Sequence, residues 1–508
     1  MDRPGTDDRF KVIIVGAGVA GLTLAHAFDK AAGIDYVVLD KHPVAPAWGS
    51  SISMYTNGAR ILDQLGLYDV LVAKAAEMQD FHLRGSDGKT HTTSPFLKVI
   101  SDRGGYLAMT LERRVFLQTL YDELPDKSKV VEHARVSSIV EESSRVKVVL
   151  ADGAVHEGDI VIGCDGIHSA VRELMWERAH RLCPGLITVA EKQRIAATYT
   201  CITGIAPYQH GLGADAVSAV SHDGFSFLFL TQPDHIYFFL FIKMPHGQVS
   251  KYPNRLRFTE ADAEAEAARF LDCPVSETLV FGDVWKTRTR GVLVALDEGV
   301  LSHWFLGRTV LCGDSAHKVT PNGGFGGNLA MESAVVLANE VYAAVQRRGR
   351  RPDDEKEKKP GDEDIRLAFQ NYQESHTPRV KRFYYMSWAW TRMQAYEGWG
   401  WYVMQRWILP VLFVSGAKQV AMLMASTPKL SFVPFDEHKG ELKWAKQKWD
   451  LLAEEKKKKN DNEPQIGSSG ASIFSKVLIA LIAISALMFY TAGVWYLGRG
   501  VKAQLNLE

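Results

Sequence analysis

The sequence predicts an α/β protein in which a Rossmann-like dinucleotide-binding domain is interrupted by a mostly antiparallel β-sheet and followed by C-terminal helices, the last of which crosses a membrane. Three observations predict this architecture. A strand, a glycine turn, a helix and a second strand succeed one another within residues 10–41, short aromatic and β-branched runs fill residues 198–243, and an uncharged apolar run occupies residues 477–497.

The N-terminal segment has the pattern of a βαβ unit. FKVIIVGAG is an apolar run that ends in glycines, VAGLTLAHAFDKA has helical spacing, and DYVVLDK is a second apolar run that ends in an acid. Gly16, Gly18 and Gly21 have the fingerprint spacing that permits a tight turn, close approach of a pyrophosphate, and close helix–strand packing. Asp40, about twenty residues further on, can accept hydrogen bonds from a ribose hydroxyl. These four residues predict a dinucleotide site.

The middle of the chain adds a sheet and then returns to the first domain. FSFLFL and HIYFFLFI predict antiparallel strands. VIGCDGIHSAVR before them has an apolar strand that ends at Asp165 and Gly166 and leads into a helix, and RTVLCGDSAH after them has a buried strand that ends at Asp314. A long helix, GGNLAMESAVVLANEVYAAV, follows, and the charge-dense stretch after it is expected to be a solvated loop.

The stretch LCGDSAHKVTPNGGFGGN allows two interpretations. Asp314, Ser315 and His317 suggest a hydrolytic triad, but a serine nucleophile needs an oriented base and a Gly-x-Ser-x-Gly elbow, and neither is evident. The four glycines after Pro321 instead remove side chains where backbone N–H groups can approach a flat ligand, next to a helix N-terminus. The stretch is therefore predicted to hold a cofactor.

The composition excludes other classes of protein. Lys and Arg number 59, as do Asp and Glu, so the net charge gives no argument for binding nucleic acid. The 5 cysteines have neither Cys-x-x-Cys nor Cys/His ligand spacing, which predicts free thiols, a reducing compartment and no metal site. The first apolar run begins only at Val12 and already has the pattern of a strand, so no signal peptide is expected and the catalytic body is expected in the cytosol.

The C-terminal run VLIALIAISALMFYTAGVWYL is long enough to cross the hydrocarbon core of a bilayer as a helix. Tyr490, Trp495 and Tyr496 lie toward one end, as interfacial aromatic residues do. The preceding lysine-rich segment keeps the large domain on the cytosolic side by the positive-inside rule, and we expect the endoplasmic reticulum. A second apolar stretch, residues 401–424, is broken by polar residues and is expected to be a core or surface-docking helix.

The three cofactor motifs together resemble the single-component flavoprotein monooxygenases, the group that includes para-hydroxybenzoate hydroxylase, over about residues 10–440. The resemblance implies that the glycine fingerprint holds the ADP half of FAD, that the Asp165 block serves FAD and the nicotinamide cofactor, and that the Asp314 block holds the ribityl chain and flavin. Together with the composition and hydropathy of the chain, it gives the following predicted segments: an FAD-binding domain at 1–190 and 291–345, a β-sheet substrate domain at 191–290, a charged loop at 346–364, a helical region at 365–450, a linker at 451–472 and a tail anchor at 473–508.

Further site residues follow from the same resemblance. Arg114 matches the family's Arg-x-x-Leu position near FAD, with Arg113 as the close alternative. Gly327 and Asn328 match the backbone that meets the isoalloxazine ring, and Gly327 stands where the family more often has Ala. Ser53 stands where a backbone-contacting Gly is usual, and Asp at position 40 replaces the commoner Glu.

More narrowly, VVLDKHPVAPAWGSSISMYTNGARILDQLGLYD, ATYTCITGI and LSFVPF resemble a fungal subgroup of FAD-dependent epoxidases in meroterpenoid and indole-diterpene biosynthesis. The resemblance implies NADPH or NADH as reductant, O2 as oxidant, and epoxidation of the terminal alkene of a prenyl chain before handover to a membrane terpene cyclase. A lipophilic prenylated substrate partitions into membrane, which fits an anchored enzyme.

The identity of a catalytic side chain stays open at this stage. The subgroup carries Tyr before the Asp-Gly of the sheet domain, but here Val220-Ser221-His222 precede Asp223. Tyr199 is left as the candidate, and a packed strand aromatic is an equal alternative. An aromatic-ring hydroxylase of the same group and a membrane-tethered FAD-binding scaffold without activity are the alternative functions.

Overall fold

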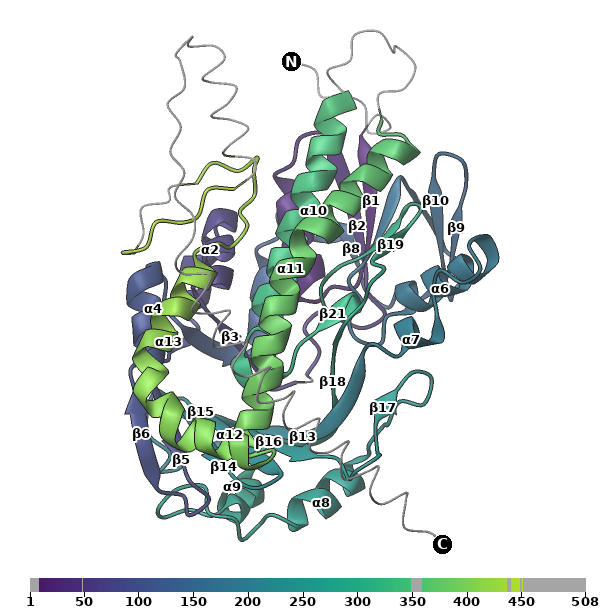
Figure 1. Ribbon diagram of the computed structural model, residues 1–508. Helices are drawn as coiled ribbons and strands as arrows, with labels where there is room; N and C mark the ends of the chain where they lie inside the picture. The colour runs from purple at the N-terminus through teal and green to yellow at the C-terminus, as the bar shows by residue number, and fades with distance from the viewer. Residues whose placement is uncertain (1–8, 48, 349–358, 436–439, 448–449, 451–508) are drawn as a thin grey trace, which may run out of the picture. The chain divides into compact units, whose positions relative to one another are not determined.

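The computed structural model describes residues 9–47, 49–348, 359–435, 440–447 and 450 (Figure 1). Its contacts divide the chain into a unit that ends at Gln447 and a second unit, Lys448–Glu508. All elements described below belong to the first unit. The predicted linker at 451–472 and the predicted tail anchor at 473–508 lie outside the described residues.

A six-stranded sheet forms the centre of the nucleotide-binding part, in the order β19-β20-β12-β1-β2-β8. Its strands are β1 (Phe10–Val15), β2 (Ile34–Leu39), β8 (Val130–Val131), β12 (Ile160–Gly163), β19 (Phe305–Leu306) and β20 (Thr309–Leu311). All neighbours are parallel except β19 and β20. The predicted βαβ unit is confirmed, with α1 (Val19–Asp29) between the parallel strands β1 and β2.

This arrangement brings the three motifs to one edge of the sheet. Because β1, β12 and β20 are parallel neighbours, their carboxyl ends lie together, and each is followed by a predicted site residue: Gly16, Asp165 and Asp314 respectively. Asp40 follows β2 at the same edge. Ligands of open α/β sheets bind at this edge.

A second, larger sheet has the order β21-β18-β13-β16-β15-β14-β5-β6, and β17 pairs with β13. Its strands are β5 (Asp80–Arg84), β6 (Thr90–Ser94), β13 (Ala196–Pro207), β14 (Ala216–Ser221), β15 (Phe225–Thr231), β16 (His235–Lys243), β17 (Ser250–Lys251), β18 (Arg290–Val300) and β21 (His317–Lys318). Only β14 and β5 pair in parallel. The sheet therefore extends beyond the predicted substrate domain at 191–290, because β5 and β6 come from within the predicted first segment and β18 from its return.

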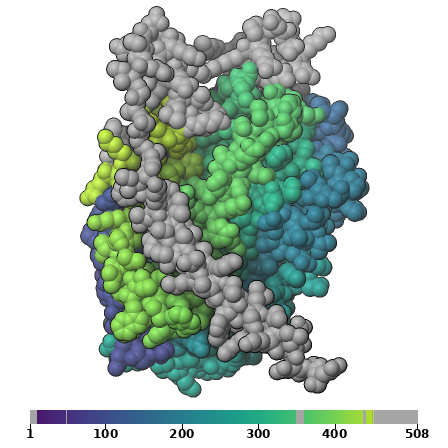
Figure 2. Space-filling view, in the orientation of Figure 1, coloured from purple at the N-terminus to yellow at the C-terminus, as the bar shows by residue number. Residues whose placement is uncertain are grey.

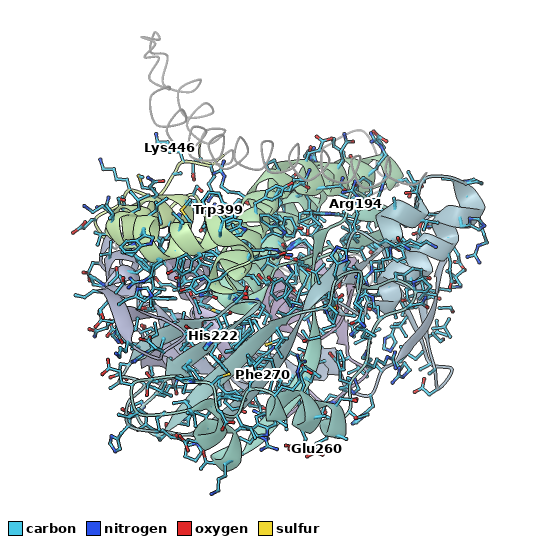
Figure 3. All side chains as sticks on the ribbon, turned by 60° about the horizontal axis from the view of Figure 1, so that its bottom comes forward. Arg194, His222, Glu260, Phe270, Trp399 and Lys446 are labelled. Carbon is cyan, nitrogen blue, oxygen red and sulfur yellow. The ribbon has the colours of Figure 1, made fainter. Side chains whose placement is uncertain are left out.

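The two faces of this sheet bury different clusters, because side chains alternate along each strand. Ile202, Phe227 and Phe238 face the side of α8 (Glu260–Ala268) and α9 (Phe281–Thr287); Figure 3 labels Glu260 and Phe270 there. The opposite face carries what we call the inner cluster. Its buried members are Met78, Phe81, Leu83, Leu97, Ala108, Tyr199, Cys201, Val217, Ala219, Leu228, Leu230, Tyr237, Phe241, Leu296, Ala395 and Phe413.

Smaller elements join the two sheets. A three-stranded sheet has β7 (Met109–Glu112) between β3 (Ser51–Met54) and β4 (Ala76–Glu77), and β9 (Val136–Glu141), β10 (Val146–Leu150) and β11 (Val155–Gly158) form an antiparallel ribbon. The helices between β3 and β13 are α2 (Thr56–Leu65), α3 (Tyr68–Val72), α4 (Phe96–Gly104), α5 (Arg113–Asp122), α6 (Ala170–Leu182) and α7 (Val189–Lys192).

The last helices pack back onto the first unit. α10 (Gly326–Arg348) and α11 (Asp362–Gln394) run side by side (Figure 1), so the predicted loop at 346–364 is helical at both of its described ends. A bent helical segment follows, made of α12 (Trp399–Val403), the π-turn η4 (Met404–Ile408) and α13 (Leu409–Met424). Beyond it, the Gln64 amide donates a hydrogen bond to the Leu430 carbonyl (2.8 Å), which ties the LSFVPF stretch to α2.

Candidate cofactor cleft

A cleft of about 730 Å³ opens at the carboxyl edge of the parallel sheet. Six predicted site residues line it: Gly16, Gly18, Asp40, Asp165, Gly166 and Asp314. Its volume is within the range of small-molecule and cofactor sites. The cleft therefore unites all three motifs that the sequence separated by up to about three hundred positions.

The glycine turn has the geometry that the fingerprint requires. Gly16 has φ +107°, and a Cβ there would lie 2.5 Å from the Cys164 carbonyl oxygen. A Cβ on Gly21 would overlap the carbonyl oxygen of Gly16, so this glycine sets the close approach of α1 to β1. Gly18 differs, because a Cβ there would meet no atom within 4 Å and its φ of −83° suits any residue. The space beside Gly18 is open cleft.

The start of α1 is left open to an anion. Gly18 is its N-cap and provides no side-chain cap, and the first turn contains no acid. The first N–H groups of a helix have no partner within the helix, and the helix dipole is positive there. A phosphate at this end would receive both kinds of stabilisation.

Asp40 is fixed at the end of β2 by the backbone. Its carboxylate accepts hydrogen bonds from the N–H groups of Ala17 (2.6 Å) and His42 (2.8 Å), one on each oxygen. A carboxylate oxygen can accept more than one hydrogen bond. Asp40 thus holds the glycine turn in place and keeps acceptor capacity toward the cleft.

Asp165 and Gly166 lock the second motif to the third. The Asp165 carboxylate accepts from the Ser169 hydroxyl (2.5 Å), the Val171 N–H (3.1 Å) and the Ser315 hydroxyl (3.2 Å). The Gly166 N–H donates to the Ser315 hydroxyl oxygen (3.0 Å), and Gly166 has φ +78°. Asp165 therefore caps the start of α6 and aligns the Asp314 loop.

The Asp314, Ser315 and His317 side chains do not form a triad, in agreement with the prediction. Ser315 bonds to the Asp165 block, Asp314 forms an ion pair with Lys318, and the His317 ring bonds to the Ser333 hydroxyl (2.8 Å). Burial lowers the pKa of His317 to about 4, so the ring is neutral near pH 7. The hydrolytic interpretation has no geometric support.

Of the two adjacent arginines in the sequence, Arg113 lines the cleft and the predicted Arg114 does not. Arg113 begins α5 and lines the cleft, whereas Arg114 is exposed and does not line it. Burial lowers the pKa of Arg113, and the nearby carboxylates Asp314 and Asp40 act in the opposite direction. The side chain is therefore a cation held between two acids of the predicted cofactor site. Successive helix positions point about 100° apart, so only one of the two arginines can face the cleft.

Other cations converge on the cleft from segments that the sequence analysis did not assign. These are Lys41, Arg135, Arg172, Arg255 and Arg257, against the acids Asp40, Asp165, Glu173 and Asp314. Arg172 ends the second motif and donates to the Ser315 carbonyl (3.0 Å), so its position was a signal that could have been used. Nothing local in the sequence marks the other four. The excess of cations suits a ligand with a doubly charged pyrophosphate.

Ser53, Gly327 and Asn328 are among the predicted residues that do not line this cleft. The Asn328 side chain donates to the carbonyls of Ser53 (2.9 Å) and Gly324 (3.0 Å) and accepts from the Tyr55 N–H (3.1 Å), so it joins α10 to β3. A Cβ on Gly327 would lie 2.7 Å from Ile52 Cδ1, so the glycine allows this close packing. The side chains here serve packing, and contact of this helix start with the isoalloxazine ring, which the resemblance implied, stays a prediction.

Tyr199 also lies away from the cleft. It is 2% exposed within the inner cluster, and its hydroxyl donates to the Glu397 carboxylate (2.8 Å). Burial raises the pKa of Tyr199, and Glu397 raises it further, so the phenol stays protonated. The Arg392 guanidinium lies 5.2 Å from its ring centroid. This environment is that of a packed, hydrogen-bonded strand residue.

The residues of the cleft fit FAD. The open space at Gly18, the uncapped helix start, the acceptor Asp40 and the cation Arg113 provide for an ADP moiety, and Asp314 lies further along the same cleft.

Comparison with known proteins agrees with this geometry. A family model described as an FAD binding domain matches residues 9–180 and 286–354. The chain is 45% identical over 437 residues to the FAD-dependent monooxygenase DEP2 of Alternaria brassicicola, covering 86% of this chain and 81% of that one. It is 44% identical to DEP2 of Fusarium langsethiae, covering 90% and 86%.

Solved structures show the same fold at low identity. Klebsiella pneumoniae HpxO complexed with FAD and uric acid is similar with a TM-score of 0.64 at 21% identity, covering 82% of this chain and 97% of that one. A salicylate hydroxylase substrate complex is similar with a TM-score of 0.58 at 17% identity, covering 82% and 98%.

Proposed function

Because the chain belongs to the FAD-dependent monooxygenases, we propose that it uses NAD(P)H and O2 to epoxidise the terminal alkene of a prenyl chain. The substrate would be a lipophilic meroterpenoid-type intermediate of secondary metabolism, which the epoxide prepares for cyclisation by a membrane terpene cyclase. FAD, when bound, supplies the electron transfer and oxygen activation that no side chain can perform. The polypeptide must hold the cofactor, orient the alkene and exclude water.

The inner cluster is the observation that carries this proposal. Its sixteen buried members are aliphatic, aromatic or sulfur-containing, and its tyrosines, Tyr199 and Tyr237, have pKa values raised by burial. Hydroxylation of a phenol benefits from a base that removes the ring proton, whereas an electron-rich alkene needs none. The inner cluster is apolar, and the carboxylate beside it, Glu397, already accepts from the Tyr199 hydroxyl (2.8 Å) and pairs with Lys243 (2.9 Å), which favours the alkene.

Part of the same sheet face is open. Val292 and Val294 of β18 are 41% and 40% exposed, although their partners on β13 are Thr203 and the buried Cys201. Paired residues of an antiparallel ladder share a face, so the valines extend the inner cluster toward solvent. Apolar strand residues left exposed beside a buried cluster suit an apolar ligand.

This open face lies beside the segment that leads to β3. The Ser50 hydroxyl donates to the Gly204 carbonyl of β13 (3.1 Å), and Arg290, the first residue of β18, bonds to the Ala47 carbonyl and to Glu112 (3.0 Å). β3 in turn packs on the α10 start through Ser53 and Asn328. A prenyl chain on the sheet face would therefore lie near the helix start proposed to meet the flavin ring.

The decisive experiment supplies NADPH, O2 and a prenylated aromatic to the enzyme and locates the added oxygen by mass spectrometry. Oxygen on the prenyl chain supports the proposal; oxygen on the ring would replace it by the hydroxylase alternative. Purified protein without flavin absorbance that takes up no FAD would refute the oxygenase proposal, whereas protein that binds FAD and transfers no oxygen would leave the scaffold alternative. Val294→Asp should lower kcat/KM for the prenylated substrate while FAD binding is kept, and Val155→Asp on the exposed β11 is the matched control.

A further inference from the structure

The helical segment Trp399–Met424 carries large apolar side chains into solvent. Among the described residues, it is the segment long and apolar enough to cross a membrane by length and composition. In the space-filling view its light-green atoms form part of the molecular surface, and Trp399 is labelled at its start in Figure 3. The cofactor cleft does not include it.

One face of this segment packs against the rest of the protein. Phe413, Ala417, Ala421 and Met424 are buried, and Phe413 packs edge-on against Phe96 with ring centroids 5.1 Å apart. The fully buried Gln405 amide donates to the Ser221 hydroxyl of β14 (2.8 Å). A helix that spans a bilayer without neighbours faces lipid on all sides. This segment instead lies along the protein with one face covered, and 22% of its most apolar window is buried.

The solvent-facing side of this segment carries large apolar side chains at helical spacing. We call this the exposed stripe; its members and their exposed fractions are Trp399 (80%), Trp407 (64%), Val411 (81%), Val414 (44%) and Met422 (46%). The members from Trp407 onward are three, four or eight residues apart, as residues on one side of a helix are, and Trp399 lies before the π-turn η4 of the same segment. Leu412 at 39% and Tyr402 at 44% flank it. The stripe is interrupted by the exposed Lys418 between Val414 and Met422, and exposed apolar side chains gathered in this way mark an interaction site.

The charges of the segment indicate which partner covers the exposed stripe. Residues 398–424 contain no Asp or Glu, and their two charged residues are Arg406 and Lys418. The Arg406 guanidinium lies 5.3 Å from the Trp407 ring centroid, and Lys418 is exposed one turn before Met422. Tryptophan beside cations is typical of helices that lie in the headgroup region of a membrane.

A second copy of the chain is less well matched. A two-fold contact through the exposed stripe would bring Lys418 and Arg406 of both copies into one interface with no acid from this segment to pair with them. Anionic lipid headgroups provide the complementary charge, and the apolar members can enter the acyl boundary.

We propose that the exposed stripe lies in the interfacial region of an anionic lipid bilayer and holds the catalytic unit on the membrane surface, independently of the predicted span at 477–497. This membrane contact needs no bound cofactor and no particular substrate. Its test is therefore independent of the test of the proposed epoxidation.

The test uses the full chain with Ile482→Arg and Leu487→Arg, because charges near the middle of the predicted span oppose its insertion. This parent is floated with vesicles of phosphatidylcholine and phosphatidylserine at about 7:3, and with phosphatidylcholine alone. Trp407→Asp with Val411→Asp is the stripe variant. Leu182→Asp with Val189→Asp is the matched control, since these residues are 60% and 71% exposed elsewhere on the surface.

We expect the parent and the control to float with the anionic vesicles, and the stripe variant to partition at least about tenfold less. Lys418→Glu should weaken binding to the anionic vesicles more than to the neutral ones. Equal flavin absorbance in all variants reports that the fold is kept. A parent that does not float, or a stripe variant that floats like the parent, overturns the proposal. So does a parent that is dimeric without lipid and becomes monomeric with Trp407→Asp and Val411→Asp.

Discussion

Replacing Gly18 by alanine should weaken FAD binding without destabilising the folded protein. Gly18 has an ordinary φ of −83°, and a Cβ there meets no protein atom within 4 Å. The apo protein should therefore fold normally, and a Gly→Ala change at a compatible position adds about 0.4–1 kcal/mol to stability through the unfolded chain. Gly21→Ala is the opposite case, because its Cβ would overlap the Gly16 carbonyl oxygen and the βα turn would have to move.

The quantity that Gly18→Ala should change is the affinity for FAD. The new methyl group projects by about 1.5 Å into the space from which a phosphate would approach the start of α1. That displacement lengthens hydrogen bonds of about 2.9 Å beyond the usual limit, and each charge-assisted bond is worth about 1.5–3 kcal/mol. Losing two of them amounts to about 3–6 kcal/mol, so the Kd for FAD should rise at least about a hundredfold.

The assay titrates apo protein with FAD and follows quenching of flavin fluorescence, with urea unfolding of the same apo proteins as the stability measurement. Gly416→Ala in α13 is the matched control, because a Cβ at that glycine also meets nothing within 4 Å and lies outside the cleft. If Gly18→Ala binds FAD as tightly as the parent, the pyrophosphate does not lie against Gly18 and the cleft assignment fails.

Three further predictions follow from the same structure. Arg113→Ala should raise the Kd for FAD at least about tenfold, the loss of one charged hydrogen bond, whereas Arg114→Ala should leave it nearly unchanged; the reverse result would contradict the assignment of Arg113. Deleting residues 473–508 should abolish carbonate-resistant membrane retention while flavin absorbance is kept, and persistent retention would refute the predicted tail anchor. His317 is neutral in the folded state because burial lowers its pKa from 6.5 to about 4. As the pH falls from about 6.5 toward 4, the unfolded state therefore takes up a proton before the folded state does, and the stability of the protein decreases. Between pH 7 and about 5.5 the loss of stability should be about 1 kcal/mol smaller in His317→Gln by urea unfolding. An unchanged loss would show that folding does not lower the pKa of His317.

The residues that the sequence identified are those whose role is set within a few positions. Gly16, Gly18 and Gly21 are fixed by one turn, and Asp165 and Asp314 by the strands that precede them, so their meeting at one sheet edge follows from parallel pairing. Arg113 and Arg114 are neighbours, and which of them faces the cleft depends on where α5 begins, which varies by a residue or two in any sequence-based assignment.

Long-range convergence was not visible in the sequence. Arg135, Arg255 and Arg257 reach the cleft from separate irregular or strand-edge positions, and only the tertiary fold places them there. The pairing of β5 with β14 could not be predicted either, because Asp80 pairs with Ala216 in a parallel register that no local sequence pattern indicates. The second apolar stretch was expected to be a core or surface-docking helix; its buried face packs on the protein as a core helix does, and docking of its exposed face stays a proposal.

The order of strands in the central sheet also determines how late in synthesis the sheet can be completed. β1 is among the first segments to leave the ribosome, but β20, which completes the parallel sheet beside β12, ends at Leu311. At about 5–20 residues per second, roughly 15–60 s separate the two. Until then the glycine turn has no Asp314 opposite it, and the apolar edge of β12 is unpaired. A nascent chain of this protein therefore has the residues for the ADP moiety long before Asp314 completes the cleft, and shielding of β12 by a chaperone would matter most in that interval.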